Sequence, residues 1–318
     1  MSTQFFLGVD GGQSSTTAMV GDEFGRVLGY GRGGPCNHVR GPEGREKFVD
    51  AIETSVSQAL TSSRLHLGPV RFSVCCLGFS GGPADKEDLL HQMLPSDRIL
   101  VTTDALVALS GATAGQPGII VIAGTGSICF GRNQAGVTAR AGGWGYVYGD
   151  EGGGFHLTRQ ALRAALRMEE GWGPATALRE ILLAETGADN ANDLLHRFYT
   201  VDFPRPRIAG LSKLVDQAAL DGDGVARDIL NEAAQQLATF IAAVRHQLFK
   251  PGDSAAVAPV GGVFHSRLLK ERFRMLVELE ECNRVIQPAY GPAAGALLEA
   301  YRIAGLSVTL SNVPESEK

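Results

Sequence analysis

Cysteine is scarce in this sequence, and the few cysteines are not spaced for pairing or metal binding. Only five of the 318 residues are cysteine, an odd number, and no two of them form a CxxC motif. A disulfide framework and a structural zinc site are therefore not expected, because both need paired or clustered thiols. We expect small buried side chains at Cys36, Cys75, Cys76, Cys129 and Cys282.

Clustered positive charge and long hydrophobic runs are also missing. The net charge is −5 and no run of Lys or Arg stands out, so a nucleic-acid partner is not expected, since binding to a phosphate backbone needs clustered cations. The first apolar segment, residues 5–9, is far shorter than a signal-peptide core or a membrane-spanning helix. We expect a cytoplasmic protein with no membrane partner.

Familiar catalytic signatures are absent as well. The sequence contains no HExxH, GxSxG or Walker A motif, and its seven histidines show no metal-ligand spacing. No pair of nucleophile and base is evident either. Among enzyme reactions, this leaves phosphoryl transfer, in which the protein mainly positions its substrates and stabilises charge.

The sequence does contain one glycine-loop motif in two copies. In each copy a short apolar strand runs into a turn of glycine and small hydroxyl residues, and a second extended stretch follows. Such a turn leaves backbone N–H groups free to bind an anion, so two of them facing each other could hold a chain of phosphates. The copies are Phe5 to Thr17, with Asp10-Gly11-Gly12-Gln13-Ser14, and Ile119 to Ser127, with Gly124-Thr125-Gly126.

The order of predicted elements indicates an α/β architecture that begins twice. Three strands open the chain, and a second set of three follows Gln116-Pro117-Gly118. Beyond residue 152 the apolar spacing is mainly helical, and the last helix is predicted to begin near Pro292. The tail from Asn312 is polar and is expected to fray. The predicted strands of the two sets are 5–9, 16–21 and 26–31, then 118–123, 127–132 and 137–141.

The repeated opening predicts two domains of ordinary size, with a boundary after residue 116. Each would begin with one of the two sets of strands, and the second would also contain helical insertions. The final part would be a helix that returns to the first domain, followed by the tail. The predicted ranges are 1–116, 117–291 and 292–318.

Asp10 places a carboxylate beside the first glycine turn. Taken alone, this turn is equally consistent with an ordinary hairpin. A carboxylate next to a phosphate site is repulsive unless a cation lies between them, so Asp10 predicts Mg²⁺, contacted through water. Ser14 and Thr16 would then add hydroxyl donors to the phosphate oxygens.

Asp104 ends a predicted strand and begins a short helix. Asp is a favoured N-cap residue, and that role alone would account for it. A catalytic role as general base is compatible with capping, because capping would hold the carboxylate in place.

The segment from Gly142 to Gly154 combines many glycines with Asp150, Glu151 and aromatic residues. So much glycine is costly to order, which makes it a poor structural segment. Carboxylates on such a loop suit a polyhydroxylated ligand; the alternative is a flexible surface loop. Further along, Gly261-Gly262 follows a predicted strand and either lets an adenine ring approach the backbone or forms a simple strand-to-helix turn.

Together these motifs resemble those of the acetate and sugar kinase, Hsp70 and actin superfamily. More narrowly, the chain resembles N-acetylglucosamine kinases of the BadF/BadG/BcrA/BcrD ATPase type over nearly its whole length. The resemblance implies an α/β fold of two ribonuclease H-like, actin- and hexokinase-type domains flanking an ATP and sugar cleft. It is carried by Cys36-Asn37-His38, Ser80-Gly81-Gly82, Thr102-Thr103-Asp104-Ala105 and the stretch from Gly142 to Gly152. Gln13 and Ser14 depart from it, since Gly and Thr are more usual there.

The resemblance implies an ATP- and Mg²⁺-dependent phosphotransferase that acts on the O6 hydroxyl of N-acetylglucosamine, with Asp104 as general base and Asp10 at the metal. A homodimer is one option for its assembly. The cofactor-binding residues that it implies are Asp10, Gly11, Gly12, Ser14, Thr16, Gly124, Thr125, Gly126, Ser127, Gly210, Gly261 and Gly262. The substrate-binding residues are Asn37, Ser80, Gly81, Asp104, Gly143, Trp144, Gly145 and Asp150.

Three alternatives compete with this assignment. The acceptor could be glucosamine, N-acetylmuramate or glucose, since a single contact can decide such specificity. An activator ATPase of a 2-hydroxyacyl-CoA dehydratase is less favoured, because no cysteine precedes the second glycine loop to hold an iron–sulfur cluster. A sugar-sensing repressor is not expected either, because only nine residues precede Asp10, too few for a DNA-binding helix-turn-helix.

Overall fold

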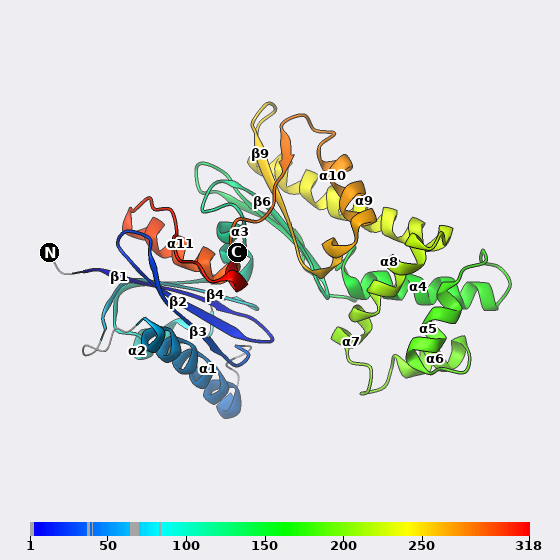
Figure 1. Ribbon diagram of the computed structural model, residues 1–318, viewed down its shortest axis with the longest axis horizontal. Coiled ribbons are helices and arrows are strands. Elements are labelled where there is room, and N and C mark those ends of the chain that lie inside the picture. Colours follow the sequence, from blue (N-terminus) through cyan, green and yellow to red (C-terminus); the bar gives the residue numbers. More distant parts are fainter. Residues whose placement is uncertain (1–2, 37–38, 40, 64–69, 83) are drawn as a thin grey trace. The chain divides into compact units, whose positions relative to one another are not determined.

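A computed structural model describes residues 3–36, 39, 41–63, 70–82 and 84–318 of the chain. The contacts divide it into two compact units, each of which has its own sheet and core. Unit 1 contains Met1–Gly118 and Gln287–Lys318, and unit 2 contains Ile119–Ile286. The predicted α/β fold class is confirmed by the alternation of strands and helices in both units (Figure 1).

Unit 1 is built on a five-stranded mixed sheet in the order β3-β2-β1-β4-β5. The first three strands form an antiparallel meander, and β4 and β5 extend it by running parallel to β1. The strands are β1 (Phe5–Gly11), β2 (Thr16–Asp22), β3 (Val27–Gly33), β4 (Phe72–Phe79) and β5 (Ser96–Thr103). The helices are α1 (Gly41–Ser62), α2 (Glu87–Met93), α3 (Asp104–Ala112), α11 (Pro292–Ala304) and the 3-10 turn η2 (Glu315–Glu317).

The two faces of this sheet are covered by different helices. Side chains of successive strand residues point to opposite faces, so Leu7 packs with the core on the α1 side and Phe6 with the core under α11. Helix α11 lies unusually close to β1, because a Cβ on Gly8 would stand 2.2 Å from the backbone nitrogen of Leu297. Helix α11 therefore packs directly against β1.

Unit 2 repeats the sheet of unit 1. Starting from β8, its strand order is β8-β7-β6-β9-β10, so in each unit the order is the third, second, first, fourth and fifth strand of that unit. The duplication predicted from the glycine loops thus extends to the whole sheet. The strands are β6 (Gly118–Ala123), β7 (Ser127–Arg132), β8 (Thr138–Gly142), β9 (Ala255–Val260) and β10 (Asn283–Val285).

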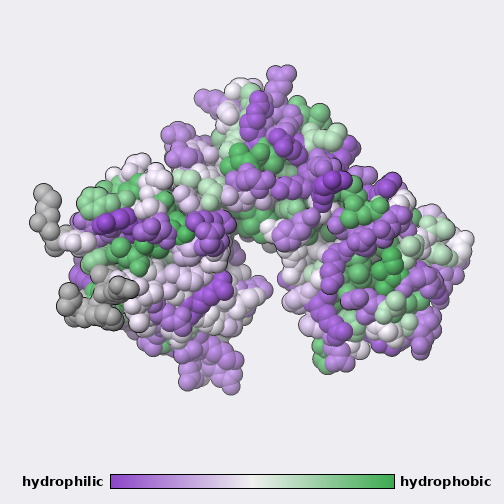
Figure 2. All heavy atoms as spheres, in the orientation of Figure 1, coloured by the Kyte–Doolittle hydropathy of each residue, from purple (hydrophilic) through white to green (hydrophobic). Residues whose placement is uncertain are grey.

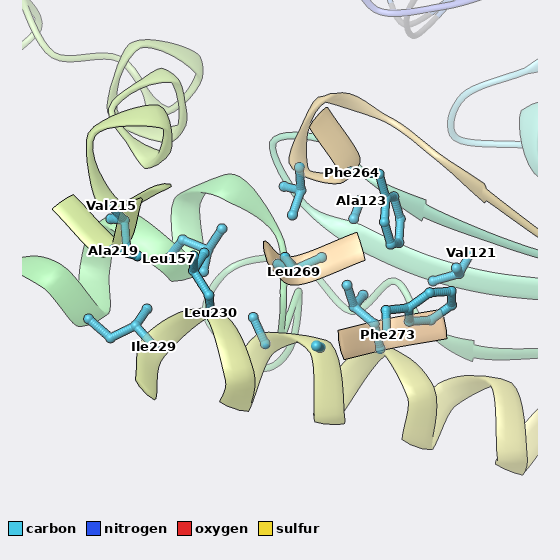
Figure 3. Close-up of a cluster of buried hydrophobic side chains, with 14 of the residues drawn as sticks. Val121, Ala123, Leu157, Val215, Ala219, Ile229, Leu230, Phe264, Leu269 and Phe273 are labelled. Carbon is cyan, nitrogen blue, oxygen red and sulfur yellow. The ribbon is translucent and has the colours of Figure 1, made fainter. Parts of the chain in front are cut away.

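The helical content predicted beyond residue 152 is also confirmed. Helix α9 is the longest element of unit 2 and buries one face against the sheet and the neighbouring helices. Figure 3 shows this core, in which the rings of Phe264 and Phe273 meet edge to face with centroids 5.1 Å apart. The helices are α4 (Gly154–Glu169), α5 (Leu178–Thr186), α6 (Ala191–Arg197), α7 (Arg205–Gly210), α8 (Ser212–Leu220), α9 (Gly224–Leu248), η1 (Gly262–His265) and α10 (Arg267–Val277).

The prediction that the tail frays from Asn312 is wrong. Val313 is buried in the core under α11, and Ser311 pairs with β3 through the N–H of Val27. The carboxylate of Glu317 is buried and accepts hydrogen bonds from the N–H groups of Ala293 and Ala294, in the first turn of α11. N–H groups in the first turn of a helix have no partner within the helix. Here Glu317, 24 positions after Ala293, supplies the acceptor, so the polarity of the tail does not indicate fraying.

Within the described residues, no helix is both long and apolar enough to cross a membrane. Figure 2 shows hydrophilic residues over much of one face of the molecule, with hydrophobic residues in separate patches between them.

Candidate functional site

The carboxyl ends of three parallel strands gather the predicted chemical groups of unit 1. Asp10 on β1 is in register with Gly78 on β4, and Gly78 with Thr102 on β5. Ser80 and Asp104 begin the segments that follow β4 and β5. Because parallel strands end at the same edge of a sheet, all three lie along one edge, where α/β proteins typically bind ligands.

The first glycine loop is held by backbone hydrogen bonds to its neighbours. The Gly12 N–H donates to the Ser15 carbonyl at 3.0 Å, which closes the turn. The Ser80 N–H donates to the Gly11 carbonyl at 3.2 Å, and the Gln13 side-chain amide to the Ser80 hydroxyl at 3.5 Å. The structure therefore joins the predicted phosphate loop to Ser80, a predicted sugar residue.

The two predicted hydroxyl donors of this loop are placed differently. Ser14 is exposed at the turn, so its hydroxyl is open to a ligand. Thr16 is fully buried, and its hydroxyl donates to the Gly34 carbonyl at 2.8 Å. The one proton of Thr16 thus ties β2 to the end of β3, and Ser14 is the better placed donor for a phosphate.

Asp10 lies in an environment that disfavours its negative charge. Burial raises the pKa of Asp10 from 3.8 to about 7, and the nearby carboxylates of Glu317 and Asp104 add to this rise. Glu317 comes from the tail and Asp104 from α3, so the fold concentrates acidic groups around one partly buried carboxylate. A bound cation would offset the repulsion between these carboxylates.

Asp104 is positioned by the helix that it begins, although not in the predicted way. The N-cap residue is Thr103, whose hydroxyl accepts the N–H of Leu106 at 3.3 Å, so the N-cap interpretation of Asp104 is wrong. Asp104 is the first residue of α3, and its Oδ1 accepts the N–H of Ala105 at 2.8 Å. This hydrogen bond still holds the carboxylate in place at the start of the helix.

A buried lysine in unit 1 was missed by the sequence analysis. Lys86 is completely buried, and its ammonium donates to the Gly82 carbonyl at 2.9 Å and pairs with Asp85 at 2.6 Å. Asp85 also accepts the N–H of Val39 at 3.4 Å. This pair therefore joins the segment after β4 to the segment after β3. The predicted sugar residue Asn37 belongs to the latter segment but lies outside the described residues.

The second glycine loop, in unit 2, is closed by the acidic loop that follows it in the sequence. The Gly154 N–H donates to the Gly124 carbonyl at 2.7 Å, and the Phe155 N–H to the Thr125 carbonyl at 3.1 Å. The Ser127 hydroxyl donates to the Glu151 carbonyl at 2.6 Å. The turn that was predicted to hold phosphate and the start of α4 thus form one structure.

Asp150 has a strained backbone conformation in this loop. Its φ is 62°, a left-handed conformation that few residues other than glycine adopt, and its side chain is buried. Its Oδ1 accepts the backbone N–H of Ser127 at 3.4 Å, and a Cβ on Gly126 would stand 2.4 Å from Oδ2. Strain of this kind persists where the surroundings hold it, and functional sites are typical places for it.

The other predicted residues of unit 2 fall into two groups. Gly261 lies against the second loop, since it has a φ of 107° and its added Cβ would stand 2.4 Å from the Ala123 carbonyl oxygen. Gly262 and Gly210 face open space. Trp144, between Gly143 and Gly145, is 66% exposed and stacks with the guanidinium of Arg140, so the structure does not bring its ring together with Asp150.

Comparison with known proteins agrees with this geometry. A model of the BadF/BadG/BcrA/BcrD ATPase family matches residues 7–300. The chain belongs to this family. It is 31% identical to an N-acetylmuramic acid/N-acetylglucosamine kinase from Clostridium acetobutylicum, an alignment that covers 93% of this chain and 98% of that protein. It is 30% identical to an N-acetyl-D-glucosamine kinase from Dictyostelium discoideum, with 93% and 99% covered.

Solved structures place this ATPase family member in a known fold. A protein from Chromobacterium violaceum, provisionally named N-acetylglucosamine kinase, superposes with a TM-score of 0.73 at 28% identity, covering 93% of this chain and 98% of the other. A ROK family glucokinase from Streptomyces griseus superposes with a TM-score of 0.52 at 20% identity, covering 94% and 98%. The fold is therefore the two-domain, ribonuclease H-like α/β fold of these sugar kinases.

The ATPase family implies a nucleotide and raises the question of its metal. Among the described residues, no three His, Cys, Asp or Glu side chains gather as a ligand set. Mg²⁺ does not require one, because it keeps several waters and is bound by one or two carboxylates together with substrate phosphates. The carboxylate of Asp10, partly buried and near two other carboxylates, fits that mode of binding.

Proposed function

We propose that this chain is an ATP-dependent amino-sugar kinase that transfers the γ-phosphoryl group of ATP to the O6 hydroxyl of N-acetylglucosamine. The observation that carries the proposal is the common sheet edge at which Asp10 and Asp104 lie together. One carboxylate suits a metal–nucleotide complex, and the other suits the proton of an acceptor hydroxyl. The names of both relatives support the acceptor.

Asp104 is the general base of the proposed reaction. Its Oδ1 is occupied by the N–H of Ala105, so we assign Oδ2 to the sugar hydroxyl. Removal of that proton as the oxygen attacks the phosphorus is typically worth about 10²- to 10⁴-fold in rate. The fixed first turn of α3 orients this oxygen before the sugar binds.

Asp10 would hold Mg²⁺, which supplies neutralisation of the charge that develops on the transferring phosphoryl group. The turn of Gly11 and Gly12 would bring phosphate oxygens to the exposed hydroxyl of Ser14, which would bind them, since the Gly12 N–H already donates to the Ser15 carbonyl. In unit 2, the loop of Gly124, Thr125 and Gly126 would do the same. The open backbone at Gly210 and Gly262, beside Gly261, would receive adenosine.

Sugar binding is assigned to the segments that Lys86 and Asp85 join, which include Asn37, Ser80 and Gly81. In unit 2 we assign it to Asp150 and to the Gly143-Trp144-Gly145 stretch. The five cysteines are all free, which favours a reducing compartment, and we infer that the enzyme acts in the cytoplasm.

Replacement of Lys86 by Met tests the sugar assignment. The loss of its two polar contacts should loosen the Ser80 turn and raise the KM for the sugar about tenfold, with the KM for ATP changed less than about twofold. Steady-state kinetics with each substrate varied in turn measures both values. Lys47→Met, which removes an exposed lysine of α1, is the matched control and should leave both KM values unchanged. Equal rises in both KM values would contradict the assignment.

A coupled ADP-release assay over a panel of sugars tests the function itself. We expect the highest kcat/KM with N-acetylglucosamine among N-acetylglucosamine, N-acetylmuramate, N-acetylmannosamine, glucosamine and glucose. Product analysis for phosphate at O6 completes the assay. Activity with none of the amino sugars would refute the proposal.

N-acetylmuramate is the second candidate acceptor. The relative from Clostridium acetobutylicum, whose name includes both sugars, favours it. The two acetamido sugars share the O6 hydroxyl, so the same Asp104 chemistry serves both. The ratio of their kcat/KM values in the panel decides between a strict and a dual-substrate enzyme.

A further inference from the structure

Asp10 and helix α11 lie on the same face of the unit 1 sheet. Successive strand residues point to opposite faces, so Asp10 points to the same side as Gly8, where a Cβ would stand 2.2 Å from the backbone nitrogen of Leu297. Earlier on that face, the ring centroids of Phe6 and Tyr301 lie 4.6 Å apart. The helix therefore runs antiparallel to β1, with Tyr301 over Phe6 and Leu297 over Gly8.

This alignment places the first turn of α11 over the end of β1. Two strand residues span about 6.6 Å and four helical residues about 6 Å, so the step from Gly8 to Asp10 matches the step from Leu297 to Ala293. The side chain of Asp10 is therefore directed toward the helix start at which the carboxylate of Glu317 is bound.

One oxygen of the Glu317 carboxylate is left without a partner. The residue is 6% exposed, and its Oε2 accepts the N–H groups of Ala293 and Ala294 at 3.0 and 3.3 Å, but its Oε1 accepts no hydrogen bond from the described residues. Arg32, the cation that acts on this carboxylate, donates from Nε to the Tyr30 hydroxyl at 2.7 Å instead. Oε1 is not one of the fully enclosed unpartnered atoms of the described chain, so it is open to a water or an ion.

The carboxylate of Asp10 is in the same condition. It accepts no hydrogen bond from the described residues, and after burial the charge of Glu317 contributes most to its raised pKa, ahead of that of Asp104. The carboxylates of Asp10 and Glu317 therefore lie within range of each other's charge, and both have oxygens that lack a donor. A magnesium ion with its bound waters meets both needs, because the ion offsets the repulsion and its waters donate to carboxylate oxygens.

We propose that Glu317 is a second carboxylate of the metal site, with its Oε1 accepting a hydrogen bond from a water of the Mg²⁺ that Asp10 holds. The two oxygens of Glu317 then have separate tasks: Oε2 fixes the carboxylate on α11, and Oε1 serves the ion. This assignment rests on the metal–nucleotide part of the proposed function and is independent of which sugar is phosphorylated.

The charge of Glu317 should act in opposite directions on nucleotide binding with and without the metal. Isothermal titration of the full-length protein with the ATP analogue AMPPNP, in Mg²⁺ and in EDTA and without sugar, measures both affinities. Glu317→Gln keeps an oxygen for the N–H groups of α11 but removes the charge. We expect metal-free AMPPNP to bind about twofold tighter, because one repulsive charge is gone, and Mg²⁺–AMPPNP about fivefold weaker. The gain in affinity from Mg²⁺ should therefore shrink about tenfold.

Glu315→Gln is the matched control. Glu315 lies in the same tail, its side chain is 88% exposed, and it pairs with Lys318, so the same change of charge should leave the gain from Mg²⁺ unaltered. Equal weakening of both titrations in Glu317→Gln would mean that this residue only caps α11, and an unaltered gain from Mg²⁺ would mean that it does not serve the metal; either result would overturn the proposal. Inactivity with the sugar panel would leave this test intact, because the titrations contain no sugar.

Hydrogen exchange on the wild-type protein tests the same contact without a substitution. The N–H groups of Ala293 and Ala294 exchange when Glu317 leaves them, so an ion that binds Glu317 in its present place should slow their exchange. Addition of Mg²⁺ to the AMPPNP complex should slow exchange in this turn about threefold or more, and should leave the buried middle of α9 unchanged. An unchanged rate at Ala293 and Ala294 would show that Glu317 does not serve the metal.

Discussion

Asp104→Asn is expected to lower kcat by about 10²- to 10⁴-fold and to leave nucleotide binding unchanged. The amide oxygen of Asn can still accept the N–H of Ala105, so the start of α3 is preserved. The amide cannot take up a proton from the sugar hydroxyl, so the chemical step alone is affected. Single-turnover kinetics and a separate titration with an ATP analogue measure the two quantities.

Asp97→Asn is the matched control for this substitution. Asp97 also lies on β5, but at the other end of the strand, where its carboxylate is exposed and pairs with Arg71. The same change of charge there should leave kcat unchanged. If Asp104→Asn turned over within about threefold of the wild type, Asp104 would not be the base.

Asp10→Asn is expected to inactivate the enzyme and at the same time to stabilise the metal-free protein. The pKa of Asp10 is raised to about 7 in the folded state, whereas an unfolded chain would titrate near 3.8. Between these values the folded state holds a proton that the unfolded state has released, so stability is lost as the pH rises from about 4 to about 7. At pH 8 the neutral Asn should recover about 2–4 kcal/mol of this loss.

Denaturant unfolding of the metal-free protein at pH 5 and pH 8 measures this effect. The advantage of Asp10→Asn should be larger at pH 8, because the wild-type carboxylate is then ionised among Glu317 and Asp104. Asp97→Asn again provides the control and should show no such gain. An Asp10→Asn variant no more stable than the wild type at pH 8 would mean that the carboxylate is not electrostatically unfavourable.

The strands and the repeat were predictable because they follow from local patterns. Apolar runs bounded by glycine and hydroxyl residues predict the β1 and β6 turns, and the second set of strands repeats the first in spacing. Parallel pairing then places Asp10 and Asp104 at one edge. Each strand and the turn after it follow from a local pattern of about ten residues.

The parts that were missed depend on contacts between distant residues. Nothing in the polar run around Lys86 indicates that this side chain is fully buried. Its polar partners Gly82 and Asp85 are local, and only the Val39 N–H that Asp85 accepts comes from a distant segment. The buried tail is similar, because the acceptors for the first turn of α11 come from Glu317. Thr103, rather than Asp104, caps α3 because Thr103 keeps an extended backbone while its hydroxyl accepts the N–H of Leu106, and the helix already begins at Asp104.

The discontinuity of unit 1 has a consequence for synthesis of the protein. Its core under α11 needs Phe6 from the first strand and Leu297 from a helix made almost 300 residues later, whereas unit 2 is one uninterrupted stretch. At translation rates of about 5–20 residues per second, the first sheet waits roughly 10–40 seconds on the ribosome for its second layer. Unit 2 can complete its core during that interval, so we expect the middle of the chain to become resistant to proteolysis before its beginning.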